Sequence, residues 1–164
     1  MELKINRSAP NLVAICVDWQ QSNNFGGRFY HKYQTDAILF SSVEEIQIAL
    51  DRFYDAICFP QAATMGRRFI ATSPTPDWKG REFVQETDKL LEHKGDLATF
   101  VVHVQYRQNA TWQGKIIWAD KKSECSFRSA LEMIKLMDQA LESTAPDAEN
   151  ENSERTLGGN GNEK

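Results

Sequence analysis

The stretch FVVHVQYRQNATWQGKIIWADKKSECSFRSALEMIKLMDQAL, residues 100–141, decides the fold because an earlier part of the chain echoes it. Residues 14–54 align with residues 101–141 at a constant spacing of 87 residues, without a gap. The identical positions are Val17 and Val104, Gln21 and Gln108, Gly27 and Gly114, Phe40 and Phe127, Ser42 and Ser129, Glu45 and Glu132, and Asp51 and Asp138. Because an internal repeat sets the architecture, the sequence predicts two tandem copies of one unit.

Each copy carries the pattern of two or three strands. Apolar and polar residues alternate along the first strand of each copy, which is typical of a strand with one buried face. Asparagine and glycine then mark a hairpin turn, because both tolerate a positive φ. The expected strands are 12–20, 28–33, 37–40, 98–107, 115–120 and 124–127, with turns at 21–27 and 109–113.

A helix is expected at the end of each copy. Ser42 with Glu45, and Ser129 with Glu132, have the spacing of a capping box, in which the serine oxygen accepts from the third amide of the helix. The apolar residues that follow recur at helical spacing. The sequence therefore predicts helices at about 43–56 and 129–142.

These elements predict an α+β domain, in which two β-β-(β)-α units share an antiparallel sheet with helices on one face and pseudo-two-fold symmetry. The single domain spans 1–142, with units 12–56 and 98–142 and an insert at 57–97. The insert is expected to hold a strand at 65–72 and a helix at 81–93. Residues 143–164 are expected to form a disordered acidic tail. The helices should cover Ile15, Val17, Val102 and Val104, and the opposite face should carry Cys16, Asp18, Gln20, Arg28, His103, Gln105, Arg107 and Lys115.

Composition narrows the classes of function. The net charge of −4 lies mostly in the tail, which leaves the folded part near neutral and argues against nonspecific duplex binding. The three cysteines are too few for a disulfide framework, and we expect each to be a small buried residue. There is no long apolar run and no secretion signal, so we expect a cytoplasmic protein without a membrane partner.

A motif, Gln-x-x-x-(Phe/Trp)-x-Gly, occurs in both copies. It comprises Gln21, Phe25 and Gly27 in the first and Gln108, Trp112 and Gly114 in the second. An aromatic residue and an amide at a loop mouth resemble the anchors of binding sites, and Arg28, Lys115 and Arg107 lie close to them in sequence. The structural alternative is that the aromatic residue packs in the core. The presence of the motif in both copies favours that alternative.

Two further groups of residues have side chains suited to a site. Cys16, Asp18 and His103 become a metal site or an activated thiol if the pseudo-axis brings them together, although no ligand-spacing motif supports this. Arg67, Arg68 and Arg81 could form a cationic pocket for phosphate or carboxylate with Arg28 and Lys115, but ordinary surface charge is favoured. Phosphate loops, nucleophile elbows and metalloprotease motifs are absent, so we expect no catalytic residue, metal or cofactor.

The runs TWQG, FRSALE and KLMD within residues 111–138 carry a resemblance. They resemble the C-terminal segment of a family of small bacterial proteins of uncharacterised activity, and FPQAATMGRRF, residues 59–69, resembles another segment of them. The resemblance implies a bacterial cytoplasmic origin and no particular activity. The sequence therefore predicts a non-enzymatic binding or adaptor protein for an unknown protein or small anionic ligand. The alternatives are a small enzyme or metal protein using Cys16, Asp18 and His103, and a nucleic-acid-binding regulator.

Overall fold

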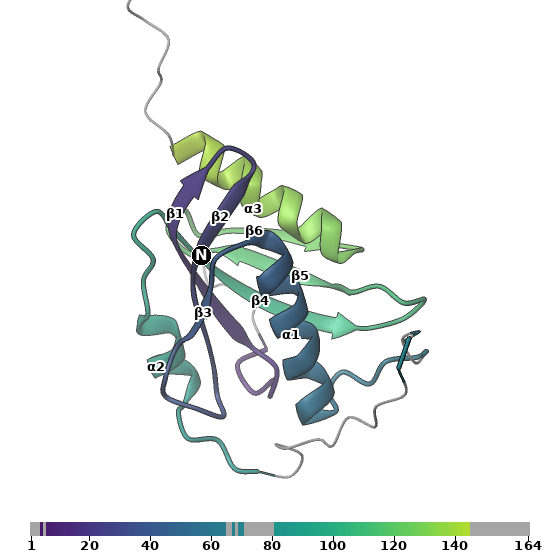
Figure 1. Ribbon diagram of the computed structural model, residues 1–164. Coiled ribbons are helices and arrows are strands. Elements are labelled where there is room, and N and C mark those ends of the chain that lie inside the picture. Colours follow the sequence, from purple (N-terminus) through teal and green to yellow (C-terminus); the bar gives the residue numbers. More distant parts are fainter. Residues whose placement is uncertain (1–3, 5, 65–66, 68, 71–80, 145–164) are drawn as a thin grey trace, which may run out of the picture.

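The sheet has six antiparallel strands in the order β3-β2-β1-β4-β5-β6, in a computed structural model that describes residues 4, 6–64, 67, 69–70 and 81–144 (Figure 1). The strands are β1 (Val13–Gln21), β2 (Asn24–His31), β3 (Ile38–Phe40), β4 (Ala98–Tyr106), β5 (Gln113–Trp118) and β6 (Ser123–Phe127). The helices are α1 (Val43–Ile57), α2 (Thr87–Glu92) and α3 (Ala130–Thr144). The α+β class and the antiparallel sheet are as predicted.

The first strands of the two halves meet at the centre of the sheet. β1 pairs with β4, and Ala14 lies opposite Val101. β2 and β3 extend the sheet on one side, and β5 and β6 extend it on the other. β3 and β6 are therefore the two edges of the sheet, each paired on one side within the described part of the chain.

The two long helices lie over the same sheet face, as Figure 1 shows. Ile15, Val17, Val102 and Val104 point into the core beneath them, as predicted from the alternation along β1 and β4. That core also holds apolar residues of α1 and α3, including Leu50 and Met137. Burying an apolar side chain of this size stabilises the fold by roughly 1.5–3 kcal/mol.

Both long helices begin as the sequence predicts. The amide of Glu45 donates to Ser42 Oγ at 3.1 Å, and the amide of Glu132 donates to Ser129 Oγ at 3.0 Å. Each glutamate also reaches back, to the amides of Ser41 and Arg128 respectively, at 2.7 and 3.2 Å. These bonds satisfy amides that have no partner within the helix, which fixes where each helix starts.

The opposite sheet face is partly covered by the insert and the N-terminal segment. Ala14 and Cys16 pack there with Leu12 and with Leu90 of α2. The predicted helix at 81–93 is shorter than expected: α2 has six residues, Thr87–Glu92. The expected strand at 65–72 falls largely outside the described residues, as does the tail apart from Ser143 and Thr144, which end α3.

The β1–β2 and β4–β5 hairpins each contain a β-bulge, which changes the sheet face on which the following side chains lie. The register shifts between Val17 and Trp19 in β1 and between Val104 and Tyr106 in β4. An extra residue in one strand reverses which face the next side chains occupy. Gln20 and Arg107 consequently reach the helices instead of the opposite face, which corrects the prediction for both.

The first hairpin turn is tighter than expected, because β2 already begins at Asn24, and both glycines of the motif lie within strands. Positive φ is found at Ser22 and at Asn109 and Ala110, whereas Gly27 and Gly114 lie within β2 and β5. A Cβ atom at Gly27 would lie 2.0 Å from the Cys16 carbonyl oxygen, and one at Gly114 would lie 2.1 Å from that of His103. Glycine is needed there because two backbones approach closely.

Candidate functional site

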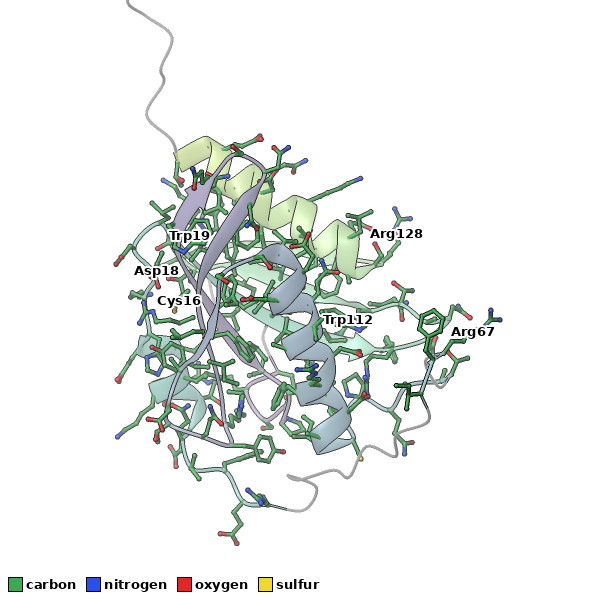
Figure 2. The ribbon with its side chains drawn as sticks, in the orientation of Figure 1. Cys16, Asp18, Trp19, Arg67, Trp112 and Arg128 are labelled. Carbon is green, nitrogen blue, oxygen red and sulfur yellow. The ribbon has the colours of Figure 1, made fainter. Side chains whose placement is uncertain are left out.

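The aromatic residues of the repeated motif lie in the core. Phe25 is fully buried and meets Phe40 edge-on, with ring centroids 6.3 Å apart. Trp112 lies beside α1 (Figure 2) and meets Tyr54 edge-on at 5.5 Å. Both rings therefore have the structural role weighed above, and neither is exposed to a partner in this structure.

The glutamines of the motif lie at the hairpin ends. Gln21 is the exposed last residue of β1. The backbone of Gln108 exchanges two hydrogen bonds with the Gln113 side chain: its amide donates at 3.4 Å and its carbonyl accepts at 3.2 Å. In the second hairpin, the Gln113 side chain therefore closes the turn, and Gln108 contributes its backbone.

Arg28 binds neighbouring parts of the same chain. Its guanidinium donates to both carboxylate oxygens of Asp18, at 2.8 and 3.0 Å, to the Tyr30 hydroxyl at 2.9 Å and to the Lys94 carbonyl at 2.9 Å. The hydrogen bonds with Asp18 raise the pKa of Arg28 and lower the pKa of Asp18. The second half has a simpler pair, Lys115 with Glu124 at 3.1 Å.

Arg107 is a buried cation that ties α1 to the second hairpin. Its side chain is 6% exposed, and it donates to the Pro60 carbonyl at 2.7 Å and to Asp55 at 2.8 Å. It also lies over the ring of Tyr54, 5.8 Å from the centroid. Arg28, Lys115 and Arg107 each have an acidic partner, so none of the three is a free cation for a phosphate.

Cys16 and His103 are not brought together. Cys16 lies opposite Thr99 across the central pairing, and His103 pairs with Lys115 on the far side of β4. Burial raises the pKa of Cys16 to about 11, which keeps it in the thiol form at neutral pH. Within the described part of the chain, no group of three His, Cys, Asp or Glu residues could hold a metal ion.

The other two cysteines differ from the prediction that all are buried. Cys58 is half-buried at the end of α1, and Cys125 is exposed on the edge strand β6. Of the arginines considered for a cationic pocket, Arg67 and Arg81 are exposed, and Arg68 lies outside the described residues. Arg28, which the pocket also required, is held by Asp18.

An apolar cleft lies between α3 and the outer half of the sheet. It has a volume of about 250 Å³, and strands β4, β5 and β6 and helix α3 all contribute to it. Its lining residues are Phe100, Ile116, Trp118, Ser123, Cys125, Leu136, Gln139, Ala140 and Ser143. None of these side chains is charged, and the polar ones are exposed, so the cleft suits an apolar group.

Trp118 contributes to the lining of this cleft. Its indole Nε1 is buried and has no hydrogen-bond partner within the described residues. A buried donor without a partner costs roughly 1–3 kcal/mol. That nitrogen has almost no exposed surface, so a ligand in the cleft does not reach it.

Two other hollows in the described surface have different chemistry. One, of about 370 Å³, lies beside β3 and includes Trp19, Leu39, Asp18 and Arg28. Figure 2 shows Asp18 and Trp19 following one another along β1. Its one cation, Arg28, already binds Asp18, and its third charged residue is Glu45. The other, of about 420 Å³, is bordered by Tyr106 and by Arg107, whose guanidinium is already bonded.

A scan against protein-family models gave no match, and neither did searches of curated proteins and of solved structures. In the described part of the chain, no helix is long and apolar enough to span a membrane. The cleft must therefore be interpreted from its own residues.

Sequence reasoning did not find Trp118, Leu136 and Ala140 as site residues. They were assigned to a returning strand and to the apolar stripe of a helix. At the spacing of 87 residues, Phe53 corresponds to Ala140 and His31 corresponds to the larger Trp118. The two changes in size largely offset each other, so the sequence carries no clear signal of the cleft.

Proposed function

We propose that the domain arose from two copies of one β-β-β-α unit, related by a pseudo-two-fold axis at the Ala14 and Val101 pair. The hairpin registers support this. Val13 pairs with His31 and Phe100 pairs with Trp118, and both partners are 87 residues apart. The bulges, the close glycine contacts and the positive φ at Ser22 and Asn109 recur at the same spacing.

The helices give a second line of support for duplication. α1 and α3 both have 15 residues, and their ends correspond at the same spacing. Each helix also bonds to the other copy's hairpin: Asp51 in α1 accepts from Arg107 at 3.5 Å, and Asp138 in α3 accepts from Gln20 at 3.4 Å. Each copy in this arrangement completes the core of the other, which explains a single domain spanning residues 12–144.

We further propose that the protein is a non-enzymatic binding protein of the bacterial cytoplasm, and that the cleft under α3 is its binding site. The observation that carries this proposal is the cleft itself, a concavity of about 250 Å³ between α3 and the sheet that is lined by uncharged side chains. A few polar groups in a mainly apolar concavity are typical of ligand sites. The exposed edge β6 runs along the same cleft, which leaves room for a partner protein that carries the bound group.

The two alternative functions have less support. A thiol enzyme needs an ionised cysteine near a base, whereas Cys16 is buried and lies away from His103. A nucleic-acid-binding protein needs cations that are available to phosphate, whereas Arg28 and Arg107 are held by carboxylates.

A fragment screen by NMR tests the proposal. Compounds of a few ring and chain types are added to isotope-labelled protein, and backbone shifts are followed. We expect the shifts to group at Ile116, Trp118, Leu136 and Ala140. Shifts that group at Trp19 and Leu39 instead, or a screen without any binder, would overturn the assignment of the site.

A further inference from the structure

The two edges of the sheet differ in how open they are to a further strand. β3 has three residues, whereas β6 has five, of which the first four are exposed. Proteins protect exposed edges with short strands, prolines, lysines or bulges. β6 has no proline or lysine, and its pairing with β5 runs without a register shift. Of the two edges, β6 is therefore the one that another strand can extend.

The backbone groups that β6 directs to solvent follow from the pairing of its neighbours. The Ala119 amide, just beyond β5, donates to the Thr99 carbonyl in β4 at 2.9 Å. Backbone groups point alternately to one side and the other along an antiparallel strand. Odd-numbered residues of β5 therefore bond to β4, and even-numbered residues bond to β6, where Cys125 is one of their partners. Cys125 thus directs its backbone groups inward, and Glu124 and Ser126 direct theirs outward.

We propose that β6 pairs with β6 of a second copy of the chain, in antiparallel orientation about a two-fold axis at Cys125. This register overlaps the whole strand, Ser123–Phe127, and sets Glu124 opposite Ser126 of the second copy. Both residues direct their backbone groups outward, so each such pair exchanges both of its hydrogen bonds. The proposal goes beyond the binding site under α3, because it rests on the backbone edge of β6 and not on the lining of the cleft.

The charges beside the edge favour this register and a second copy as the occupant. Glu124 lies diagonal to Arg128 of the second copy, and long side chains reach each other at diagonal positions. The Arg128 side chain is 89% exposed, and its ion pair with Glu132 is loose, at 3.5 Å. Lys122 lies outside the pairing, in the turn before β6, where it has a positive φ. An axis at Glu124 would set two carboxylates opposite each other, which is destabilising, and an axis at Ser126 would shorten the overlap.

Cys125 is exposed and reports this register. Opposite residues that share no hydrogen bond have Cα atoms about 4.5 Å apart, within the roughly 4.4–6.8 Å that a disulfide spans. Oxidised glutathione exchanges with the two thiols, which gives one disulfide between the copies and two reduced glutathiones. The chain tested carries Cys58→Ser, which removes the half-buried thiol.

The matched control for the cross-link is Ser126→Cys in a chain that also carries Cys125→Ser and Cys58→Ser. Position 126 is exposed as well, but its side chain lies on the other face of the sheet and away from the axis. We expect the chain with Cys125 to form the linked dimer at least about tenfold faster than the control, because pairing raises the effective concentration of the two thiols. Non-reducing gel electrophoresis measures both rates.

Two variants of Ser126 test the backbone pairing. Ser126→Pro removes an amide that points away from β5 and should abolish the fast cross-link, whereas Ser126→Ala keeps that amide and should leave the rate unchanged. Sedimentation of the reduced protein should show a monomer–dimer equilibrium that Ser126→Pro shifts to monomer. Edge pairing buries little surface, so the dimer should dissociate on dilution. If Ser126→Pro does not fold, Glu124→Arg, which repels Arg128 of the second copy, should slow the cross-link instead.

The outcomes separate this inference from the proposed function. A protein that sediments as a monomer at every concentration, or cross-links at equal rates at positions 125 and 126, would overturn the pairing of β6. The fragment screen reports on the cleft lining, so it can succeed or fail whatever the oligomeric state. Because Cys125 also lines the cleft, pairing at this residue would set the two clefts on either side of the axis.

Discussion

The space beneath α1 and the space beneath α3 are bounded by corresponding elements. The first is filled by side chains, and the second contains a cleft. Under α1, the rings of His31, Tyr33 and Phe53 lie against one another, with His31 and Phe53 at 4.3 Å. Under α3, Trp118 borders a cleft of about 250 Å³ next to Ala140. One half uses its own side chains to complete its core, and the other leaves room. The difference teaches that two halves built from corresponding elements can differ in whether the space beneath the helix is filled.

The largest effect on stability is expected from removing the Phe53 ring beneath α1. Phe53→Ala removes a buried ring that packs on His31, and such changes cost roughly 3–5 kcal/mol of unfolding free energy. Urea unfolding followed by circular dichroism measures the loss. Leu131→Ala, on an exposed side of α3, is the control and should change stability by less than about 0.5 kcal/mol. A loss below about 1 kcal/mol for Phe53→Ala would show that the space under α1 is not a packed core.

His31, which lies under α1, predicts that the stability of the fold depends on pH. Its counterpart under α3 adds no such dependence. Burial lowers the pKa of His31 from 6.5 to about 4. Between these values the unfolded chain binds a proton and the folded chain does not, so stability falls as pH drops from about 6.5 to about 4. The loss attributable to His31 is roughly 3 kcal/mol. Trp118, its counterpart, does not titrate.

NMR titration of the imidazole signals isolates this contribution, because the pKa values of His93 and His103 are also lowered, mainly by burial. His31 should titrate last as the pH falls. A His31 signal that titrates near pH 6.5 would contradict the burial seen here, and the space under α1 would then be open to water.

The smallest effect on stability is expected from removing the helix caps, which both halves have. Ser42→Ala and Ser129→Ala each remove a helix cap, and each should cost about 1 kcal/mol. Because the two caps have nearly the same geometry, the two losses should agree within about 0.5 kcal/mol. Ser126→Ala on the exposed edge strand serves as the control, and chemical denaturation measures all three. Unequal losses would mean that the halves differ in their helix starts as well as in their cores.

Most of the secondary structure could be predicted from the sequence because its signals are local. The capping pairs at Ser42 and Ser129 mark the helix starts, and alternation identifies the residues beneath the helices. The bulges could not be predicted, because a bulge depends on how two strands pair. They turn Trp19 outward, to 39% exposed, and carry Arg107 to α1. Gly27 was expected in the first turn for the same reason, since its role depends on the opposite strand.

The candidate site was less predictable than the fold. The motif around Phe25 and Trp112 is repeated because each half needs it for its core, so repetition selected structural residues. The cleft depends on how α3 packs on the sheet, which no local pattern of the sequence encodes. The exposure of Cys125 could not be predicted either, because it follows from the edge position of β6.

The central pairing of β1 with β4 has a consequence for synthesis of the chain. β1 can form a hairpin with β2 as soon as both have left the ribosome, but its other edge waits for Ala98–Tyr106. Pairings between residues this far apart in sequence slow folding. During translation, the nascent first half therefore presents a bare apolar strand until the second half arrives.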